Sequence, residues 1–141
     1  MGPPPLKITA DTNVLVRAAT LDDRMQAALA TDLLRDAEVI AVTLPKLCEF
    51  AWVLGRGYNW AAPDVLGFIA TLLGSPSVRV GHAAVEAGLA MLAAGGDFAD
   101  GVIAFEGRRL GGEIFASFDQ KAVELIKAQG GDIRLLGSPT T

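Results

Sequence analysis

The alternation of short apolar, β-rich runs with longer helical stretches is the feature that most constrains the fold of this chain. Helical spacing of apolar residues, together with Gly and Pro stop signals, predicts helices between short strands along the whole sequence. Strands alternating with helices indicate an α/β fold with a parallel central sheet covered by helices. We expect about five strands, at residues 6–10, 38–42, 78–80, 113–118 and 133–136. The helices are expected at residues 12–19, 23–37, from the cap at Thr43 to about 55, 62–73, 82–94, 98–110 and 120–129.

Length and composition restrict the class of protein further. The 141 residues fit a single domain, with an extended lead-in over residues 1–5 and a loose tail over residues 137–141. A hydrophobic content of 51% excludes a disordered chain, and a single cysteine excludes a disulfide framework or a multi-cysteine zinc site. No secretory signal pattern and no membrane-length apolar run are visible, so we expect a cytoplasmic protein. The net charge of −4 argues against nonspecific nucleic-acid binding through a broadly basic surface.

Four acidic residues stand at the starts of predicted helices. Asp11 and Asp119 directly follow predicted strands, and Asp97 and Asp100 open the helix that begins near residue 98. Asp is a favoured N-cap residue, and acids in the first turn complement the helix dipole, so each position has a purely structural interpretation. Ser117 points to the same side of its strand as Asp119 and is placed to hydrogen-bond there.

Glu49 is the least ordinary of the acids. It is the only charged residue in residues 47–54, an apolar segment whose helix we expect to be largely buried. A buried carboxylate is costly unless it is paired or bound to a metal. An ion pair with Arg17 or Lys46 is therefore one interpretation, and a metal ligand is the other.

Taken together, the acids suggest a metal site. The carboxyl ends of parallel strands, and the helix starts that follow them, lie at the same edge of a sheet, where ligands bind in α/β folds. Carboxylates that converge there repel one another, and a hard divalent cation such as Mg²⁺ relieves that repulsion. Such a site activates water and stabilises phosphoryl oxygens.

At these residues the sequence resembles the PIN-domain family and, within it, the VapC-type toxins of toxin–antitoxin pairs. Four segments carry the resemblance in the family's order and span nearly the whole chain, although each alone is a weak signal. They are residues 11–17 (DTNVLVR), 47–54 (LCEFAWVL), 97–104 (DFADGVIA) and 117–121 (SFDQK). Gly101 stands where the family usually has Ala, which is expected to loosen the helix start, and Ser117 stands where Thr is usual.

The resemblance implies a Rossmann-like α/β/α fold and a Mg²⁺- or Mn²⁺-dependent endoribonuclease that cleaves RNA with metal-activated water. It implies a homodimer and a VapB-type antitoxin that covers the site. It places the catalytic and metal-binding acids at Asp11, Glu49, Asp100 and Asp119, with Asp97 as an auxiliary metal ligand.

Other residues receive supporting roles as hypotheses. Asn13 and Ser117 are expected to hydrogen-bond the metal ligands. Trp52, Trp60 or residues 83–94 are candidates for a dimer interface, although core packing is favoured for both tryptophans. The basic residues near the motifs are candidates for phosphate contacts, with ordinary solvated charges as the alternative: Arg17, Lys46, Arg108, Arg109 and Lys121.

Two other functions compete with the nuclease. One is a noncatalytic PIN-fold module that binds RNA or a protein, which loss of an acid would favour, and none is lost here. The other is a different Mg²⁺-dependent phosphohydrolase. The haloacid-dehalogenase-like Asp-x-Asp pattern is broken by Asn13, and no lysine follows the last predicted strand as a phospho-receiver needs.

Overall fold

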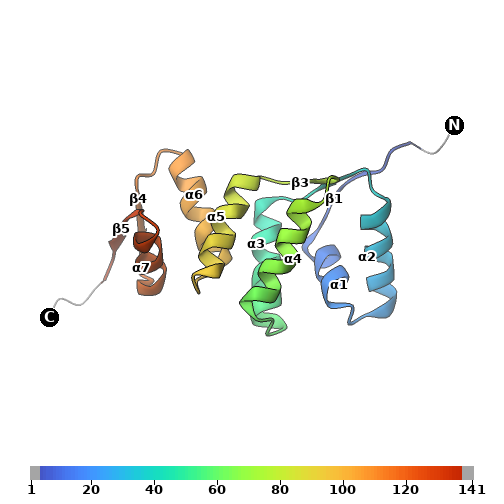
Figure 1. Cartoon of the computed structure of the whole chain (residues 1–141), viewed down its shortest axis with the longest axis horizontal. Helices are drawn as coiled ribbons and strands as arrows, with labels where there is room; N and C mark the ends of the chain where they lie inside the picture. Colours follow the sequence, from blue (N-terminus) through green and yellow to red (C-terminus); the bar gives the residue numbers. More distant parts are fainter. Residues whose placement is uncertain (1–3, 138–141) are drawn as a thin grey trace. The chain divides into compact units, whose positions relative to one another are not determined.

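A computed structural model of the chain describes residues 4–137, and the outer residues of the predicted lead-in and tail, 1–3 and 138–141, lie outside this range. The structure is a mixed α/β fold with seven α-helices in the described residues (Figure 1). The strands are β1 (Lys7–Thr9), β2 (Val39–Ala41), β3 (Val78–Arg79), β4 (Ile114–Ser117) and β5 (Asp132–Leu135). The helices are α1 (Thr12–Thr20), α2 (Arg24–Asp36), α3 (Leu44–Trp52), α4 (Ala62–Gly74), α5 (His82–Ala93), α6 (Phe98–Arg109) and α7 (Gln120–Ala128).

The chain forms two compact units, one ending at His82 and the other beginning at Ala83, and each is described by itself. In the first unit, β1, β2 and β3 form a parallel sheet in that order, with Ile40 of β2 paired to Ile8 and Val78. In the second unit, β4 and β5 form a parallel pair against which α7 packs (Figure 1).

The prediction of one central sheet of about five strands is therefore corrected. All five predicted strands form and every pairing is parallel, but the structure pairs them as one sheet of three strands and one of two. Alternating strands and helices predict parallel pairing, because a helix crossover returns the chain in the same direction, but they do not determine which strands are neighbours. Among the strands of residues 4–137, only β2 has a neighbouring strand on both edges, and Ile40 at its centre is buried.

The core of the first unit forms where apolar faces of α1, α3 and α4 meet. Leu15, Phe50, Leu54 and Ile69 are fully buried there. The rings of Phe50 and Phe68 lie 5.3 Å apart in a tilted arrangement, a favourable geometry for aromatic pairs. Beyond Trp52, α3 continues as the π-helical turn η1 (Val53–Gly57), so the helix predicted to end near residue 55 extends slightly further with wider turns.

In the second unit, two glycines allow α5 and α6 to pack closely. A Cβ atom on Gly101 of α6 would clash with the backbone oxygen of Ala87 and would lie 2.8 Å from the Cα of Gly88. A Cβ on Gly88 would lie 2.6 Å from the ring of Phe98. The missing side chain of Gly101 permits the close approach of α6 to α5, and the expectation that Gly101 loosens the start of its helix stays a prediction. None of the helices within residues 4–137 has the length and apolar run that a membrane crossing requires.

We predict that Gly101→Ala destabilises the protein. The added methyl group meets backbone atoms that cannot rotate away, and overpacking of this kind costs about 1–3 kcal/mol. Gly107 lies in the same helix, and a Cβ there meets nothing within 4 Å. Gly107→Ala is the matched control and should stabilise the protein by roughly 0.5–1 kcal/mol through helix propensity. Chemical denaturation measures both, and equal effects of the two substitutions would refute the packing argument.

Candidate active site

In the first unit, Lys46 brings Asp11 and Glu49 together. Asp11 follows β1 and is the N-cap of α1, where its carboxylate accepts a hydrogen bond of 2.9 Å from the backbone N–H of Thr12. Lys46 and Glu49 lie one turn apart in α3. The Lys46 Nζ atom lies 3.1 Å from Oδ1 of Asp11 and 3.7 Å from Oε2 of Glu49.

The contact between Lys46 and Asp11 shifts the pKa values of both side chains. The hydrogen bond from Lys46 lowers the pKa of Asp11, with smaller contributions from the Thr12 N–H and the lysine charge. The same hydrogen bond raises the pKa of Lys46, and the charges of Asp11 and Glu49 add to it. Both groups are therefore held firmly in their charged forms at neutral pH.

The expectation that Glu49 is buried is wrong. Its side chain is 54% exposed, because the buried face of α3 is formed by its neighbours Leu47, Phe50 and Ala51. An apolar segment with a single charge can expose that charge when the helix is covered on one side only. Glu49 is therefore accessible to a metal ion or to substrate, and its ion pair with Lys46 is a surface contact.

The two tryptophans also differ from the expected core packing. Trp52 is 63% exposed, at the end of α3 and three residues beyond Glu49 on its exposed face. Trp60 is half-buried and follows η1. Trp52 therefore contributes little to the core of the unit and is available for contact with another molecule.

The second unit places three acids at the starts of two helices. Asp97 is the N-cap residue of α6, Asp100 lies in its first turn, and Asp119 is the N-cap of α7. Burial raises the pKa of Asp100, and the negative charges of Asp97 and Asp119 raise it further. Among the residues that the structure describes, no lysine or arginine forms an ion pair with these three acids. The like charges are therefore crowded without a compensating cation.

The capping interpretation holds for Asp119 but not for Asp97. The carboxylate of Asp119 accepts a hydrogen bond of 3.0 Å from the backbone N–H of Ala122. Asp97 has the extended backbone of an N-cap residue, but its side chain makes no capping hydrogen bond. The hydroxyl of Ser117 accepts a hydrogen bond of 3.0 Å from the backbone N–H of Asp119 and so helps fix the turn that carries this acid.

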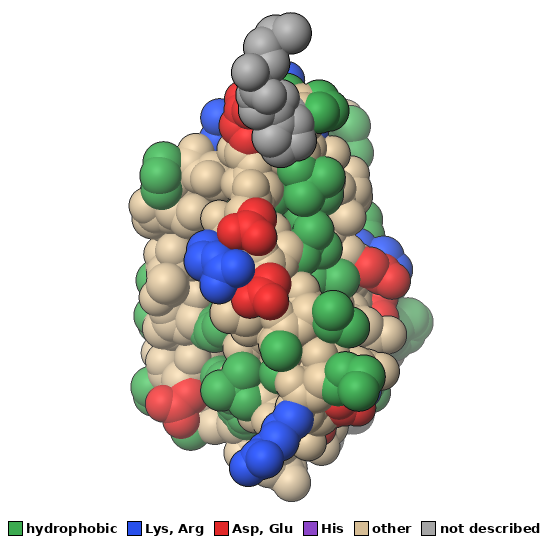
Figure 2. Space-filling view, turned by 90° about the vertical axis from the view of Figure 1, so that its right-hand side faces the viewer, with side chains coloured by type: hydrophobic (Ala, Val, Ile, Leu, Met, Phe, Trp, Pro, Cys, Tyr) green, Lys and Arg blue, Asp and Glu red, His purple; other side chains and the backbone are tan. Residues whose placement is uncertain are grey.

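Asn13 and Arg17 face a shallow groove between α1 and α2 of about 250 Å³, which is also lined by Leu29 and Leu33. No hydrogen bond within residues 4–137 joins the Asn13 side chain to Asp11 or Glu49, so its assignment as a hydrogen-bonding partner of the ligands stays a prediction. Leu29 is 66% exposed, as are Met25 and Leu21 nearby at 75% and 60%. Apolar side chains gather on this side of the unit, beside a small group of charged ones (Figure 2).

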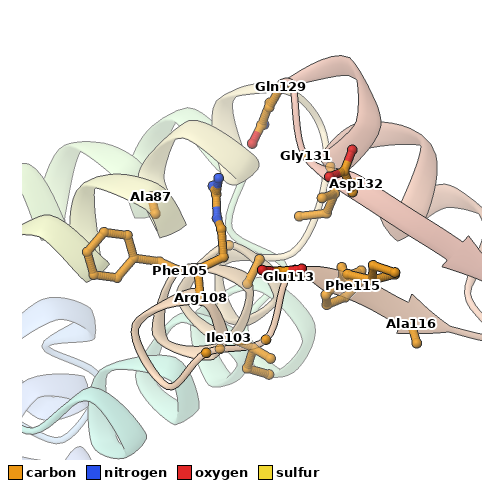
Figure 3. Close-up of a pocket in the computed structure, with 18 residues that line it drawn as sticks. Ala87, Ile103, Phe105, Arg108, Glu113, Phe115, Ala116, Gln129, Gly131 and Asp132 are labelled. Atoms are coloured by element: carbon orange, nitrogen blue, oxygen red, sulfur yellow. The ribbon is translucent and has the colours of Figure 1, made fainter.

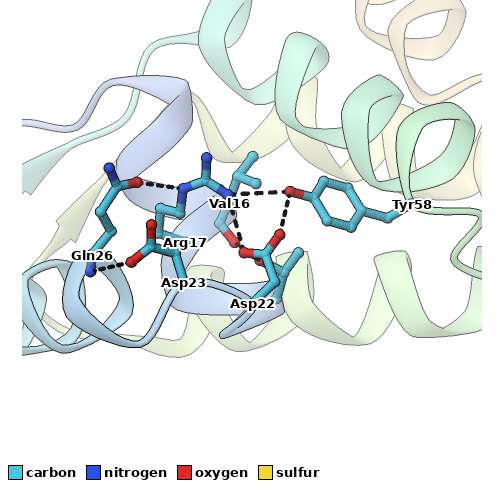
Figure 4. Close-up of polar contacts among 7 residues, drawn as sticks. Val16, Arg17, Asp22, Asp23, Gln26 and Tyr58 are labelled. Carbon is cyan, nitrogen blue, oxygen red and sulfur yellow. Dashed lines mark hydrogen bonds and ion pairs between the residues drawn. The ribbon is translucent and has the colours of Figure 1, made fainter.

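Arg17, a candidate for phosphate contact, is engaged within the protein (Figure 4). Its guanidinium donates hydrogen bonds to Gln26 at 2.7 Å, to Asp22 at 3.0 Å and to the Tyr58 hydroxyl at 3.2 Å. The Tyr58 hydroxyl in turn donates to Asp22 at 2.9 Å. This network ties the turn between α1 and α2 to the residue that follows η1. Sequence analysis missed Tyr58, since no local pattern links it to residues 36 or more positions away.

The remaining basic candidates are exposed in the second unit. Lys121 lies in the first turn of α7, and Arg108 lies in the last turn of α6. Neither forms an ion pair with the residues described, whereas Arg109 pairs with Glu106 at 2.9 Å. Arg108 also lines a pocket of about 640 Å³ between the end of α6 and the β4–β5 pair, together with Phe105 and Glu113 (Figure 3). The three acids of this unit are not among its lining residues, so the pocket is separate from them.

The donor chemistry of both units suits a hard divalent cation. All five candidate ligands are carboxylates, which Mg²⁺ and Mn²⁺ prefer. In the first unit, the acid pair already holds a cation, the Lys46 ammonium, and in the second unit the crowded acids have none. Within neither unit do the described residues gather three or more His, Cys, Asp or Glu side chains closely enough to hold a metal by themselves.

The structure is an α/β fold with parallel strands, and carboxylates stand at helix starts that follow the strands, which is where ligands bind in folds of this class. The sequence profile of the PIN domain matches residues 8–127, which span both units and include every candidate acid. The chain therefore belongs to the PIN domain family, and this membership assigns it a nuclease-type fold. Comparison with curated proteins gives no match.

We predict that Asp22→Asn weakens the network around Arg17 in a pH-dependent way. Hydrogen bonds from Thr20 and Tyr58, together with the Arg17 charge, lower the pKa of Asp22. A lowered folded-state pKa contributes stability above the unfolded-state value of about 4, and this contribution is lost as the pH falls through the folded-state value. The melting temperature of Asp22→Asn should lie a few degrees below that of the wild type at pH 7, and the difference should shrink below about pH 4.

Asp32→Asn is the control for this prediction. Asp32 forms a single exposed ion pair with Arg35 within α2, and surface pairs of this kind contribute little. Thermal unfolding of the three proteins between pH 3 and pH 7 makes the comparison. A constant difference between the wild type and Asp22→Asn across this range would show that the charge of Asp22 is not what stabilises the network.

Proposed function

We propose that this chain is a Mg²⁺- or Mn²⁺-dependent endoribonuclease of the VapC type, the toxin of a toxin–antitoxin pair. The observation that carries the proposal is that burial raises the pKa of Asp100 and the charges of Asp97 and Asp119 raise it further, with no described basic partner at hand. Such a group is costly without a cation. Membership of the PIN family supports hydrolysis of a nucleic acid as the use of that cation.

In this proposal, the acids that the resemblance assigns would hold the cation, and other groups of the chain fix their positions within each unit: Asp11 and Glu49 in the first unit, and Asp97, Asp100 and Asp119 in the second. When bound, the cation supplies an activated water and stabilises charge on the phosphoryl oxygens. Asp11 and Asp119 are fixed by their hydrogen bonds at helix starts, and Ser117 holds the turn before α7. Glu49 would bind the cation or orient the attacking water, and its exposed position on α3 supports this role.

RNA is the proposed substrate, and cleavage is expected to leave 5′-phosphate and 3′-hydroxyl ends, as the resemblance implies. Arg108 and Lys121 are the proposed phosphate contacts, because both are exposed and have no described ion-pair partner. Arg17 and Lys46 are less available, since each is engaged with acids of its own unit. An excess of local positive charge is needed because the chain carries a net charge of −4.

The partners follow from the same resemblance. A VapB-type antitoxin would cover the site, and the exposed apolar residues of α2, Met25 and Leu29, offer surface of the kind that a partner segment buries. A homodimer is the proposed assembly, with exposed Trp52 as a candidate interface residue. We propose a cytoplasmic location, in keeping with a toxin that acts on cellular RNA.

The central prediction concerns Asp100. Purified protein should cleave structured RNA at discrete sites with Mg²⁺ or Mn²⁺ and not with EDTA. Asp100→Asn should reduce the rate by at least about a hundredfold, because a charged ligand of the cation is lost. Asp64→Asn is the matched control, since Asp64 is an exposed acid in the first turn of α4 outside the candidate set. Its rate should match that of the wild type.

The outcomes separate the enzyme from its main alternative. RNA bound but not cut, with or without metal, would favour a noncatalytic binding module. Cleavage that survives Asp100→Asn unchanged would remove that residue from the catalytic set.

The toxin role has its own test. Induced expression in a bacterial host should arrest growth, and the Asp11→Asn protein, expressed to the same level, should not. Asp11 is the acid fixed at the start of α1, so this change removes a proposed ligand while leaving a side chain that can still cap the helix. Equal arrest by both proteins would separate toxicity from nuclease chemistry.

A further inference from the structure

We propose that the Lys46 ammonium is a built-in counter-cation that holds Asp11 and Glu49 in the metal-free protein and is displaced when the divalent cation binds. The inference rests on the proposed metal-dependent function and adds to it a residue that sets metal affinity. Its basis is one contact set within the first unit, in which Nζ of Lys46 lies 3.1 Å from Asp11 and 3.7 Å from Glu49.

Helix stability does not explain where Lys46 lies. It is the third residue of α3, in the turn where the helix dipole is positive and a cation is disfavoured. Its i,i+3 pair with Glu49 has the lysine on the N-terminal side, the weaker of the two orientations. The shortest contact of Lys46 is instead with Asp11, a residue 35 positions earlier at the start of another helix. The position of the Lys46 ammonium is therefore explained by its contacts with the two carboxylates, not by helix stability.

The exposure of these side chains also allows a metal ion to replace the Lys46 ammonium. The Lys46, Asp11 and Glu49 side chains are 43%, 65% and 54% exposed, so water and ions reach all three. The lysine stem is flexible and can turn its ammonium into solvent without disturbing the core. One ammonium also balances only one of the two carboxylates, so a negative charge remains to attract a divalent cation.

The second unit gives the comparison. Asp97, Asp100 and Asp119 have no such lysine among their described neighbours, whereas Asp11 and Glu49 share the ammonium of Lys46. The two sets of acids therefore differ in whether the protein itself supplies a cation. A metal ion approaching Asp11 and Glu49 competes with Lys46, and this competition weakens its binding.

The test measures Mn²⁺ binding to the full chain without RNA, from the free Mn²⁺ signal in electron paramagnetic resonance. Lys46→Met keeps the apolar stem and removes the charge, and we expect it to bind Mn²⁺ roughly three- to tenfold more tightly than the wild type, as the loss of two exposed ion-pair contacts allows. Lys46→Arg keeps the charge and should stay near the wild-type affinity. Lys46→Gln is a second neutral variant, so the result does not depend on how one side chain is tolerated.

A matched control removes the same charge elsewhere. Lys127 lies in the last turn of α7, at the opposite end of that helix from Asp119, and Lys127→Met should leave Mn²⁺ affinity unchanged. In an Asp11→Asn background, Lys46→Met should increase Mn²⁺ affinity less than it does in the wild type. The reason is that the carboxylate nearest to Lys46, that of Asp11, has already been neutralised. Circular dichroism checks that every variant is folded.

The outcomes distinguish the two proposals. Tighter binding in both neutral Lys46 variants and not in Lys127→Met supports displacement of Lys46 by the metal. Mn²⁺ binding that is equal or weaker in the Lys46 variants, while the wild type binds, overturns this inference and leaves the metal-dependent function standing. Absence of Mn²⁺ binding in the wild type and all variants overturns both.

Discussion

Repulsion among carboxylates at helix starts is the constraint on which the candidate site depends. Acids are favourable at these positions, since the backbone N–H groups and the dipole stabilise each one separately. Placing several together reverses the balance, because like charges that share a site raise one another's pKa. Lys46 lies beside Asp11 and Glu49, whereas burial raises the pKa of Asp100 and the charges of Asp97 and Asp119 raise it further.

The packing around the acids explains why they stay where they are. In the second unit, the absent side chain of Gly101 lets the helix that carries Asp97 and Asp100 lie directly against α5. In the first unit, the network of Arg17, Asp22 and Tyr58 holds the far end of the helix that Asp11 caps. In each unit, a packing or hydrogen-bond contact thus holds a helix whose start carries candidate acids, as a preorganised site requires.

The sequence predicts the local elements well because their signals are local. Glycine at residues 95–96, 111–112 and 130–131 follows the predicted helix ends, and the structure ends α5, α6 and α7 just before them. The capping interpretation of Asp119 is confirmed, because its carboxylate accepts a hydrogen bond from the backbone N–H of Ala122 in α7. These features depend on a few neighbouring residues, so spacing alone is enough to find them.

The features that the sequence did not predict depend on distant neighbours. Glu49 and Trp52 are exposed because the rest of the unit covers the opposite face of α3. A segment that is apolar nearly all round does not specify which of its faces will be covered. The close contact at Gly101 depends on α5, and the Lys46–Asp11 pair joins residues of two helices. The division of the strands into two sheets is likewise a matter of neighbours that the alternation of strands and helices leaves open.

The distribution of the basic residues has a consequence for how an acidic chain attracts RNA. Arg17, Arg35, Lys46 and Arg109 all lie in ion pairs with acids of their own unit, so they add little attraction for phosphate. A site made of carboxylates repels a phosphodiester until cations offset its charge. In the proposed function, a bound divalent cation would offset part of that charge, and the ammonium of Lys46, displaced from Asp11 and Glu49, would become free to contact phosphate. Metal binding and RNA binding would then be coupled through one lysine, with the metal-free protein holding RNA only weakly.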